Sequence, residues 1–344
     1  MTNSQRVDIN LFFHNEIAYL DQTIRSIVDQ TWTSWQLTLI DDGSTDGSTE
    51  VAEAWAGRDP RIRLKRLRAN HGIVGAYRRA FAEGDADFVM PKSGDDLIAP
   101  DFIERVMTVL ISEPETVMCH AGAVNIDDAG TVTAQVPSWC YLNTSTGDAV
   151  ARALHVMERY TFSPAFWGIY RRKVVDMAHP PMACGGWDHA FVAEIALYGN
   201  IRHVPEPLFQ RRGGPVPLNL LARSASLSWS RTRSEGDIFT DYTMLVPLAT
   251  CVWAHAETFA LARVSAVERA FLIEAARRIF QLRWGDQLRA EAASFRAHLP
   301  RLLTGVTRAH EAGAPGSALR QKLDLDRLVA VLDWVTAGLQ ENAA

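Results

Sequence analysis

The sequence predicts an α/β fold with a mostly parallel sheet, followed by a helical C-terminal region. Short apolar runs alternate with segments of helical periodicity up to about residue 212, which is the pattern of βαβ units. Beyond about residue 238 only helical periodicity is found. With 344 residues, 47% of them hydrophobic, the chain can form one large domain and an appendage.

The first part of the chain supplies the sheet. Strands are predicted over residues 7–13, 35–40, 62–68, 87–90 and 116–124, with helices from about residues 16, 46, 73 and 100. Asp46 is predicted to be the N-cap of the second helix, and Pro100 suits the first turn of the fourth.

The second part of the chain is predicted to be helical. Residues 213–237 are rich in Gly, Pro and Ser and are expected to form a mobile connection. Ser265 and Glu268 have the spacing of a capping box, followed by an apolar stripe at residues 271, 275 and 279. The predicted division is therefore 1–212, 213–237 and 238–344. The last part is a candidate for acceptor binding or for pairing of two subunits.

Composition excludes several classes of protein. A net charge of −5 and a pI near 6.1 argue against nucleic-acid binding. The four cysteines are widely spaced, which suits neither a disulfide framework nor a zinc site. Neither a signal peptide nor an apolar run of ~20 residues is found, so a cytoplasmic location is expected, with peripheral membrane association left open. Dinucleotide-binding and P-loop motifs are also lacking.

Polar side chains follow four of the predicted strands. They are Asn15 and Glu16, Asp41 and Asp42, Asn70 and His71, and Asp95 and Asp96. Ligands of open α/β sheets bind outside the carboxyl ends of the strands, so we expect these side chains to converge on one binding site.

Each polar cluster also has a purely structural interpretation. Asp41 and Asp42 either belong to a Gly- and Ser-rich turn or accept hydrogen bonds from the base or ribose of a nucleotide. Asp95 and Asp96 form either a solvated turn or a site for a divalent cation and a diphosphate. Asp188 either caps a helix or acts as a general base beside Trp187, with His189 as the second candidate.

In their order along the chain these motifs resemble the family 2 glycosyltransferases, which have the nucleotide-diphosphosugar transferase fold called GT-A. The resemblance covers about residues 7–212. The motifs are HNE (14–16), SIVDQTW (26–32), LIDDGSTDGS (39–48), NHGI (70–73), SGDD (93–96) and WD (187–188).

The resemblance implies an inverting hexosyltransferase that uses a nucleotide-diphosphosugar, with UDP- or dTDP-sugars as the favoured donors. It implies Mg²⁺ or Mn²⁺ at Asp95 and a catalytic base at Asp188. Nucleotide-sugar contacts are expected from Phe13, Asn15, Glu16, Asp41, Asp42, Asn70, Gly72, Ser93, Gly94, Asp96 and Arg212. Trp167, Trp187 and His189 are candidate acceptor contacts, and the acceptor is a saccharide, a lipid-linked glycan, a natural product or a peptide.

The sequence departs from the family pattern in three places. Ser93 replaces the first acid of the usual D-x-D-D pattern, and Phe12-Phe13 stands where the family tends to have Pro and a small polar residue. Arg212 stands where a metal-binding His is frequent; an arginine cannot ligate a cation, although it can pair with phosphate. Ser93 and Arg212 keep open the alternative of a catalytically inactive domain that binds a sugar nucleotide or scaffolds a complex. A nucleotidyltransferase, which shares the α/β shape and the metal, and a helical interaction module formed by the C-terminal region are the other two alternatives.

Overall fold

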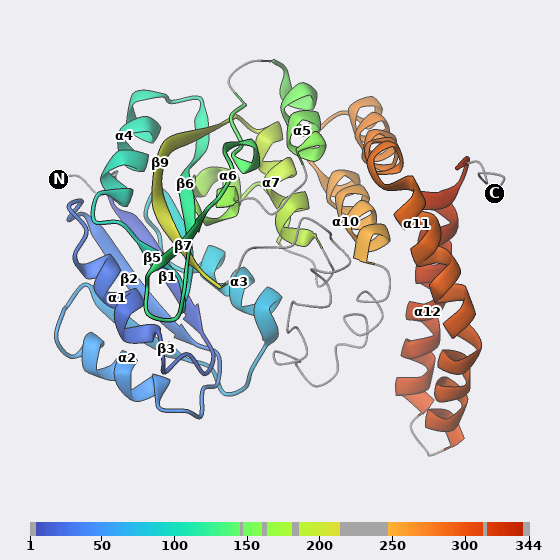
Figure 1. Ribbon diagram of the computed structural model, residues 1–344, viewed down its shortest axis with the longest axis horizontal. Coiled ribbons are helices and arrows are strands. Elements are labelled where there is room, and N and C mark those ends of the chain that lie inside the picture. The colour runs from blue at the N-terminus through green and yellow to red at the C-terminus, as the bar shows by residue number, and fades with distance from the viewer. Residues whose placement is uncertain are drawn as a thin grey trace. The chain divides into compact units, whose positions relative to one another are not determined.

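The computed structural model describes residues 5–144, 147–159, 164–180, 186–213, 247–311 and 315–339 (Figure 1). Its chain divides into two compact units. The first comprises Met1–Pro181, Phe191–Val216 and Trp229–Ser234, and the second Met182–Ala190, Pro217–Ser228 and Glu235–Ala344. The predicted mobile connection, 213–237, lies outside the described residues except for Gly213.

The first unit is built on one mixed sheet. Its strands are β1 (Val7–Phe13), β2 (Trp35–Asp41), β3 (Ile62–Arg66), β4 (Phe88–Ser93), β5 (Leu97–Ile98), β6 (Thr116–Ile126), β7 (Val132–Gln135), β8 (Ile169–Arg171) and β9 (Asn200–Arg212). They lie in the order β3-β2-β1-β4-β8-β6-β9-β5, with β7 paired to β6. The pairs β3–β2, β2–β1, β1–β4 and β6–β9 are parallel, which confirms the predicted fold class.

Helices connect these strands. They are α1 (Leu20–Val28), α2 (Ser48–Ala56), α3 (Gly72–Ala82), α4 (Phe102–Ser112), α5 (Ala149–Glu158), α6 (Arg172–Val175) and α7 (Trp187–Leu197). Every residue of β1 and of β6 is buried, as expected of central strands covered on both faces. This burial explains why these strands are mostly apolar, with only a few buried polar side chains such as Asp8 and Asn10.

Three local predictions need correction. The first helix starts at Leu20 rather than residue 16, because residues 17–19 form a turn in which the Tyr19 N–H donates to the Glu16 carbonyl at 3.0 Å. Gly47, with φ 99°, is the N-cap of α2, and Asp46 instead accepts a hydrogen bond from the Ser48 N–H at 3.0 Å. The antiparallel strand β8 separates β4 from β6, which the alternation of elements did not predict.

The register of the parallel strands brings three carboxyl ends to the same level. Phe13 lies opposite Asp41 on β2, and Phe12 lies opposite Ser93 on β4. The polar residues that follow β1, β2 and β4 therefore begin at the same edge of the sheet.

The second unit contains three long helices, α10 (Pro247–Leu261), α11 (Ala266–Glu311) and α12 (Pro315–Thr336), which confirms the predicted helical region. The capping box is present: the Ser265 N–H donates to Glu268 Oε2 at 2.9 Å, and the Glu268 N–H donates to Ser265 Oγ at 3.2 Å. The predicted stripe is displaced by one residue, since Leu272, Ala276 and Phe280 are the buried positions. None of the described helices combines the length and hydropathy required to cross a bilayer.

A buried acid on α11 caps the preceding helix of the same unit, α10. The carboxylate of Glu291 accepts hydrogen bonds from the N–H groups of Leu248 (3.0 and 3.1 Å) and Ala249 (3.1 Å) in the first turn of α10. Burial raises the pKa of Glu291 from 4.5 to about 7, although these hydrogen bonds favour the charged form.

We therefore expect the free energy of unfolding to fall as the pH rises from about 4.5 to about 7. In this window the unfolded chain releases the Glu291 proton while the folded chain retains it, at a cost on the order of 3 kcal/mol at most. Urea unfolding at several pH values should show a steeper fall in the wild type and in the exposed control Glu274→Gln than in Glu291→Gln, in which the raised pKa of Glu16 still contributes a slope of the same sign. Equal slopes in all three proteins would contradict the prediction.

Candidate active site

The loops that follow β1 and β2 are joined by hydrogen bonds. The Asn15 N–H donates to Ser44 Oγ (3.1 Å), the Glu16 N–H to Ser48 Oγ (2.8 Å) and the Ile17 N–H to Asp46 Oδ2 (3.0 Å). In the opposite direction the Thr45 N–H donates to Asn15 Oδ1 at 2.8 Å. Asn15 therefore shapes the loop through both its side chain and its left-handed backbone (φ 57°).

Asp41 stabilises the same loop rather than facing solvent. Its Oδ1 accepts from the Ser44 N–H at 2.8 Å and its Oδ2 from Thr49 Oγ1 at 2.6 Å, and the residue is 2% exposed. This engagement favours a structural role for Asp41, so that its predicted contact with a nucleotide rests on the resemblance alone.

The carboxylate of Asp42 is hydrogen-bonded to His71, the residue that precedes α3. Its carboxylate accepts from the His71 N–H (3.0 Å to each oxygen) and from His71 Nδ1 (2.9 Å). Beside this pair, the Asn70 side chain accepts from the Gly72 N–H at 2.7 Å, and Gly72 has a φ of 71°. The predicted cluster of Asp42, Asn70, His71 and Gly72 is thus brought together at the start of α3.

The turn between β4 and β5 holds the acidic pair. Asp96 is buried: its Oδ1 accepts from the Arg212 N–H at 2.8 Å and its Oδ2 from Ser93 Oγ at 3.0 Å. Burial and then the charge of Asp95 raise the pKa of Asp96. A side chain at Gly94 would collide with Phe13, since its Cβ would lie 2.9 Å from the Phe13 Cβ. Asp96 and Gly94 therefore shape the turn.

Asp95 and Glu16 differ from Asp41, Asp42 and Asp96, whose carboxylates are hydrogen-bonded within the chain. Asp95 is half-buried, and its carboxylate accepts no hydrogen bond from the described part of the chain. Burial, followed by the charges of Asp95 and Asp96, raises the pKa of Glu16 to about 8. Two adjacent carboxylates with this excess of negative charge suit a divalent cation that also binds diphosphate oxygens.

The protein ligands at this turn are few. Within the described ranges no group of three or more His, Cys, Asp or Glu side chains is placed to hold a metal ion. Mg²⁺ commonly uses only one or two protein carboxylates and takes its other ligands from phosphate and water. The residues present therefore fit a cation that binds together with its nucleotide.

Lys92 stabilises the backbone of the acidic turn, a role that was not predicted from the sequence. Its side chain is fully buried, and Nζ donates to the carbonyl oxygens of Asp96 (2.6 Å) and Ser93 (3.1 Å). Burial lowers the pKa of Lys92 to about 8, although Asp96 and Asp95 oppose this shift. The signal in the sequence was a single lysine at the end of an otherwise apolar strand.

Arg212 closes the other side of the turn. Its Nε donates to the Asp95 carbonyl (2.9 Å), its Nη1 to the carbonyls of Asp127 and Asp128 (2.7 Å each), and its Nη2 to Gln22 Oε1 (3.0 Å). The guanidinium also lies over the Tyr19 ring, 4.4 Å from its centroid. With four of its five N–H donors engaged within the chain, Arg212 is better suited to positioning the turn than to binding phosphate.

Aromatic side chains near the strand ends are mainly packing residues. Phe13 is 2% exposed and belongs to the core, which argues against the predicted contact between its side chain and a nucleotide base. Trp167 is half-buried and stacks on Phe209 with ring centroids 5.8 Å apart. It therefore retains an exposed surface on which an acceptor contact remains a prediction.

The remaining predicted residues belong to the second unit. Trp187, Asp188 and His189 form the first turn of α7; Trp187 is 4% exposed and Asp188 is half-buried. His189 is 5% exposed, and its Nδ1 lies 3.3 Å from Nε2 of His255 on α10. This burial favours packing roles for Trp187 and His189 over acceptor contacts, and leaves Asp188 as the accessible acid of the motif.

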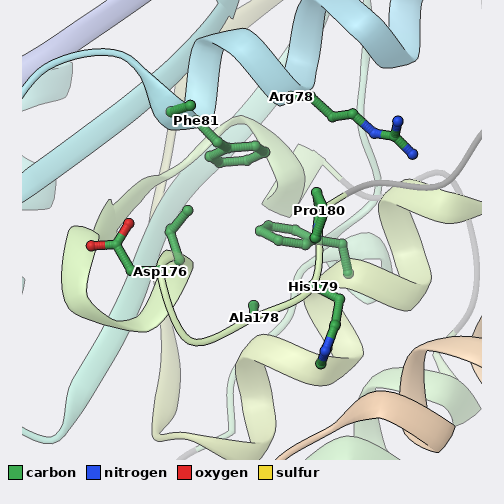
Figure 2. A pocket seen from close by; sticks show the side chains of 9 residues that line it. Arg78, Phe81, Asp176, Ala178, His179 and Pro180 are labelled. Atoms are coloured by element: carbon green, nitrogen blue, oxygen red, sulfur yellow. The ribbon is translucent and has the colours of Figure 1, made fainter.

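A small pocket of about 190 Å³ lies elsewhere in the first unit (Figure 2). Its lining comes from the last turns of α3 (Arg78, Phe81 and Ala82) and from Val175, Asp176, Ala178, His179, Pro180 and Phe191. In Figure 2, Arg78, Asp176 and His179 point away from the apolar centre beside Phe81 and Pro180. None of the predicted site residues lines this pocket, which lies at the opposite end of α3 from Gly72.

Comparison with known proteins identifies similar chains. Residues 9–176 match the model of Glycosyl transferase family 2. An uncharacterized glycosyltransferase of Nostoc sp. is 26% identical over 230 residues, which cover 64% of this chain and 69% of that protein. The uncharacterized glycosyltransferase YibD of Escherichia coli is 26% identical over 178 residues, which cover 51% of each chain. This chain thus spans about half the length of YibD.

Solved structures share the fold. The crystal structure of S. aureus TarS 1–349 in complex with UDP-GlcNAc superposes with a TM-score of 0.51 at 16% identity, covering 98% of this chain and 93% of that chain. The complex of the same TarS fragment with UDP has a TM-score of 0.51 and covers 81% of this chain and 92% of that chain. At this identity the likeness establishes the GT-A fold alone.

Proposed function

The chain belongs, through residues 9–176, to glycosyl transferase family 2, and we propose that it transfers a sugar from a nucleotide-diphosphosugar to an acceptor with inversion. The observation that carries this proposal is the acidic turn. Asp95 has a carboxylate that accepts no hydrogen bond from the described residues, and its charge acts on Glu16. Asp42 follows β2 at the same edge of the sheet, with β1 between β2 and β4. A cation with its diphosphate at one position and a nucleoside at the other would occupy this edge.

We further propose that UDP- or dTDP-sugars are the donors and that Mg²⁺ or Mn²⁺ binds at Asp95, with Glu16 beside it. The TarS fragment, which has a similar fold, was solved in complex with UDP-GlcNAc, which supports the choice of a UDP-sugar. A divalent cation, when bound there, supplies Lewis-acid stabilisation of the departing diphosphate.

Residues of the chain itself are proposed to position Asp95 and to take up the acceptor proton. Lys92 and Arg212 hold the backbone of the acidic turn, so that Asp95 keeps its orientation without reorganisation during the reaction. Asp188 is proposed to take the proton from the acceptor nucleophile as it attacks the anomeric carbon from the face opposite the diphosphate. In-line attack would convert an α-linked donor into a β-linked product.

We also propose a cytoplasmic location and the pairing of two subunits through the C-terminal helices. The proposed acceptor is a saccharide, a lipid-linked glycan, a natural product or a peptide. Exposed apolar side chains on α11, at Val267 (80%), Phe271 (54%) and Leu282 (86%), support an interaction surface on the helical region. An inactive member that only binds a sugar nucleotide is the alternative favoured by Ser93 and by Arg212, which both deviate from the family pattern.

We expect one of UDP, dTDP and GDP to bind much more tightly in the presence of Mn²⁺ than in its absence. The reason is that Lys92 and four of the five side-chain N–H donors of Arg212 are engaged within the chain, so the diphosphate charge needs an added cation. Calorimetric titration of each nucleotide, with Mn²⁺ or with EDTA, measures this difference. Absence of binding under every condition would overturn the proposed function, whereas binding without transfer to any acceptor would favour the inactive alternative.

A further inference from the structure

The imidazole of His71 lies between a buried acid and solvent at the carboxyl edge of the sheet. Its side chain is 39% exposed, whereas that of Asp42, to which it is hydrogen-bonded, is 3% exposed. A ligand at this edge would therefore meet the histidine ring rather than the carboxylate.

The orientation of the ring is determined from two sides. Its Nδ1 lies 2.9 Å from Asp42 Oδ1, and the His71 backbone N–H binds the same carboxylate. On the other side, α3 passes so close that a Cβ at Gly75 would lie 2.7 Å from the His71 Cβ. The glycine therefore leaves the space in which the side chain of His71 sits.

These contacts also determine the hydrogen-bonding character of the exposed nitrogen. A carboxylate can only accept hydrogen bonds, so Nδ1 must carry a proton toward Asp42. In a neutral imidazole the other nitrogen, Nε2, is then an acceptor. The edge thus presents one acceptor of defined direction at the end of β2.

The distance to the acidic turn suits a single nucleotide. Asp42 follows β2 and Asp95 follows β4, and β1 lies between these strands. Two strand spacings amount to about 10 Å. The base and the diphosphate of one extended nucleotide are separated by a comparable length. A diphosphate at Asp95 therefore allows the base to reach the Asp42–His71 pair.

We propose that His71 reads the base of the donor nucleotide: Nε2 accepts a hydrogen bond from the ring imino N–H of uracil, thymine or guanine, and Asp42 positions the ring. This inference rests on the proposed function and adds a specificity-determining residue to it. It also reassigns Asp42 from a direct base contact to a positioning residue.

The test uses a nucleotide that lacks the one hydrogen atom in question. The tightest binder among UDP, dTDP and GDP is compared with its ring-N-methyl analogue, methylated at N3 of the pyrimidine or N1 of guanine. Titration in Mn²⁺ should show that methylation weakens binding to the wild type by about 10- to 100-fold, because it removes a hydrogen bond and leaves an acceptor unpaired. In His71→Ala the parent nucleotide should lose a similar factor, and methylation should cost nothing more.

Asp42→Asn provides a second variant with a distinct expectation. An amide at this position can donate to Nδ1, which would place the ring proton on Nε2 and abolish the acceptor. The methylation penalty should therefore disappear in Asp42→Asn as well. His14→Ala is the matched control: its Nδ1 lies 2.9 Å from the Asp42 backbone oxygen on the same rim, and the penalty should persist in this variant.

The alternatives give different results in the same titrations. A penalty lost in Asp42→Asn but fully kept in a folded His71→Ala would show that Asp42 reads the base directly, and would overturn the inference. CDP and ADP, whose rings carry no imino N–H, are titrated alongside, and a wild-type preference for either of them would overturn the inference too. If no nucleotide binds, the proposed function itself fails. Thermal unfolding of each variant establishes that it is folded.

Discussion

Asp188→Asn is expected to reduce sugar transfer by roughly a hundred- to ten-thousand-fold while donor-nucleotide affinity stays within about twofold of the wild type. An amide cannot take up the acceptor proton, although it has nearly the size of the carboxylate. The measurement is the transfer rate at saturating donor and acceptor, together with calorimetric titration of the nucleotide.

Asp148→Asn is the matched control for a structural role of Asp188. Asp148 caps α5 through a 2.8 Å hydrogen bond from the Ala151 N–H, and none of the proposed site contacts involves it. It should lose a little stability and no transfer. If Asp188→Asn lost nucleotide binding and transfer to the same extent, the carboxylate would be a structural group and the assignment as base would be wrong.

Asp95→Asn is expected to weaken the binding of the nucleoside diphosphate in Mn²⁺ by at least about 100-fold, since it removes one of the two carboxylates that the described residues offer to a cation at this turn. Binding in EDTA should change little, so that the stimulation by Mn²⁺ disappears. The structural cost should be small, because the side chain of Asp95 makes no hydrogen bond to the described residues whereas Asp96 makes two.

Two comparisons separate this loss from general damage to the site. The nucleoside without phosphates should bind the wild type and Asp95→Asn equally, because the cation contacts only the diphosphate. Asp128→Asn is the control variant. It also removes one negative charge, but in a neighbouring turn, where Asp128 accepts a hydrogen bond from the Tyr19 hydroxyl. If Mn²⁺ stimulated binding to Asp95→Asn as much as to the wild type, the cation would not bind at this turn.

The positions of β1, β2, β3, β4 and β6 along the chain and the position of the acidic turn could be predicted from the sequence. Strands buried on both faces, such as β1, are mostly apolar, and the change to polar residues marks where each strand ends. The strand β8 could not be predicted in this way. It has three residues, too few to show periodicity, and its pairing with β4 and β6 is a contact between distant parts of the chain.

The sequence alone determined that acidic and amide side chains follow several strands of one sheet, because parallel strands bring their carboxyl ends to the same edge. Only the tertiary structure decided which of them are engaged. Asp41 and Asp96 are bound within the chain, His71 covers Asp42, and Asp95 keeps its carboxylate unengaged by the described residues. The reason is that the partners, such as Thr49, His71 and Arg212, are brought in by folding from positions up to 116 residues away.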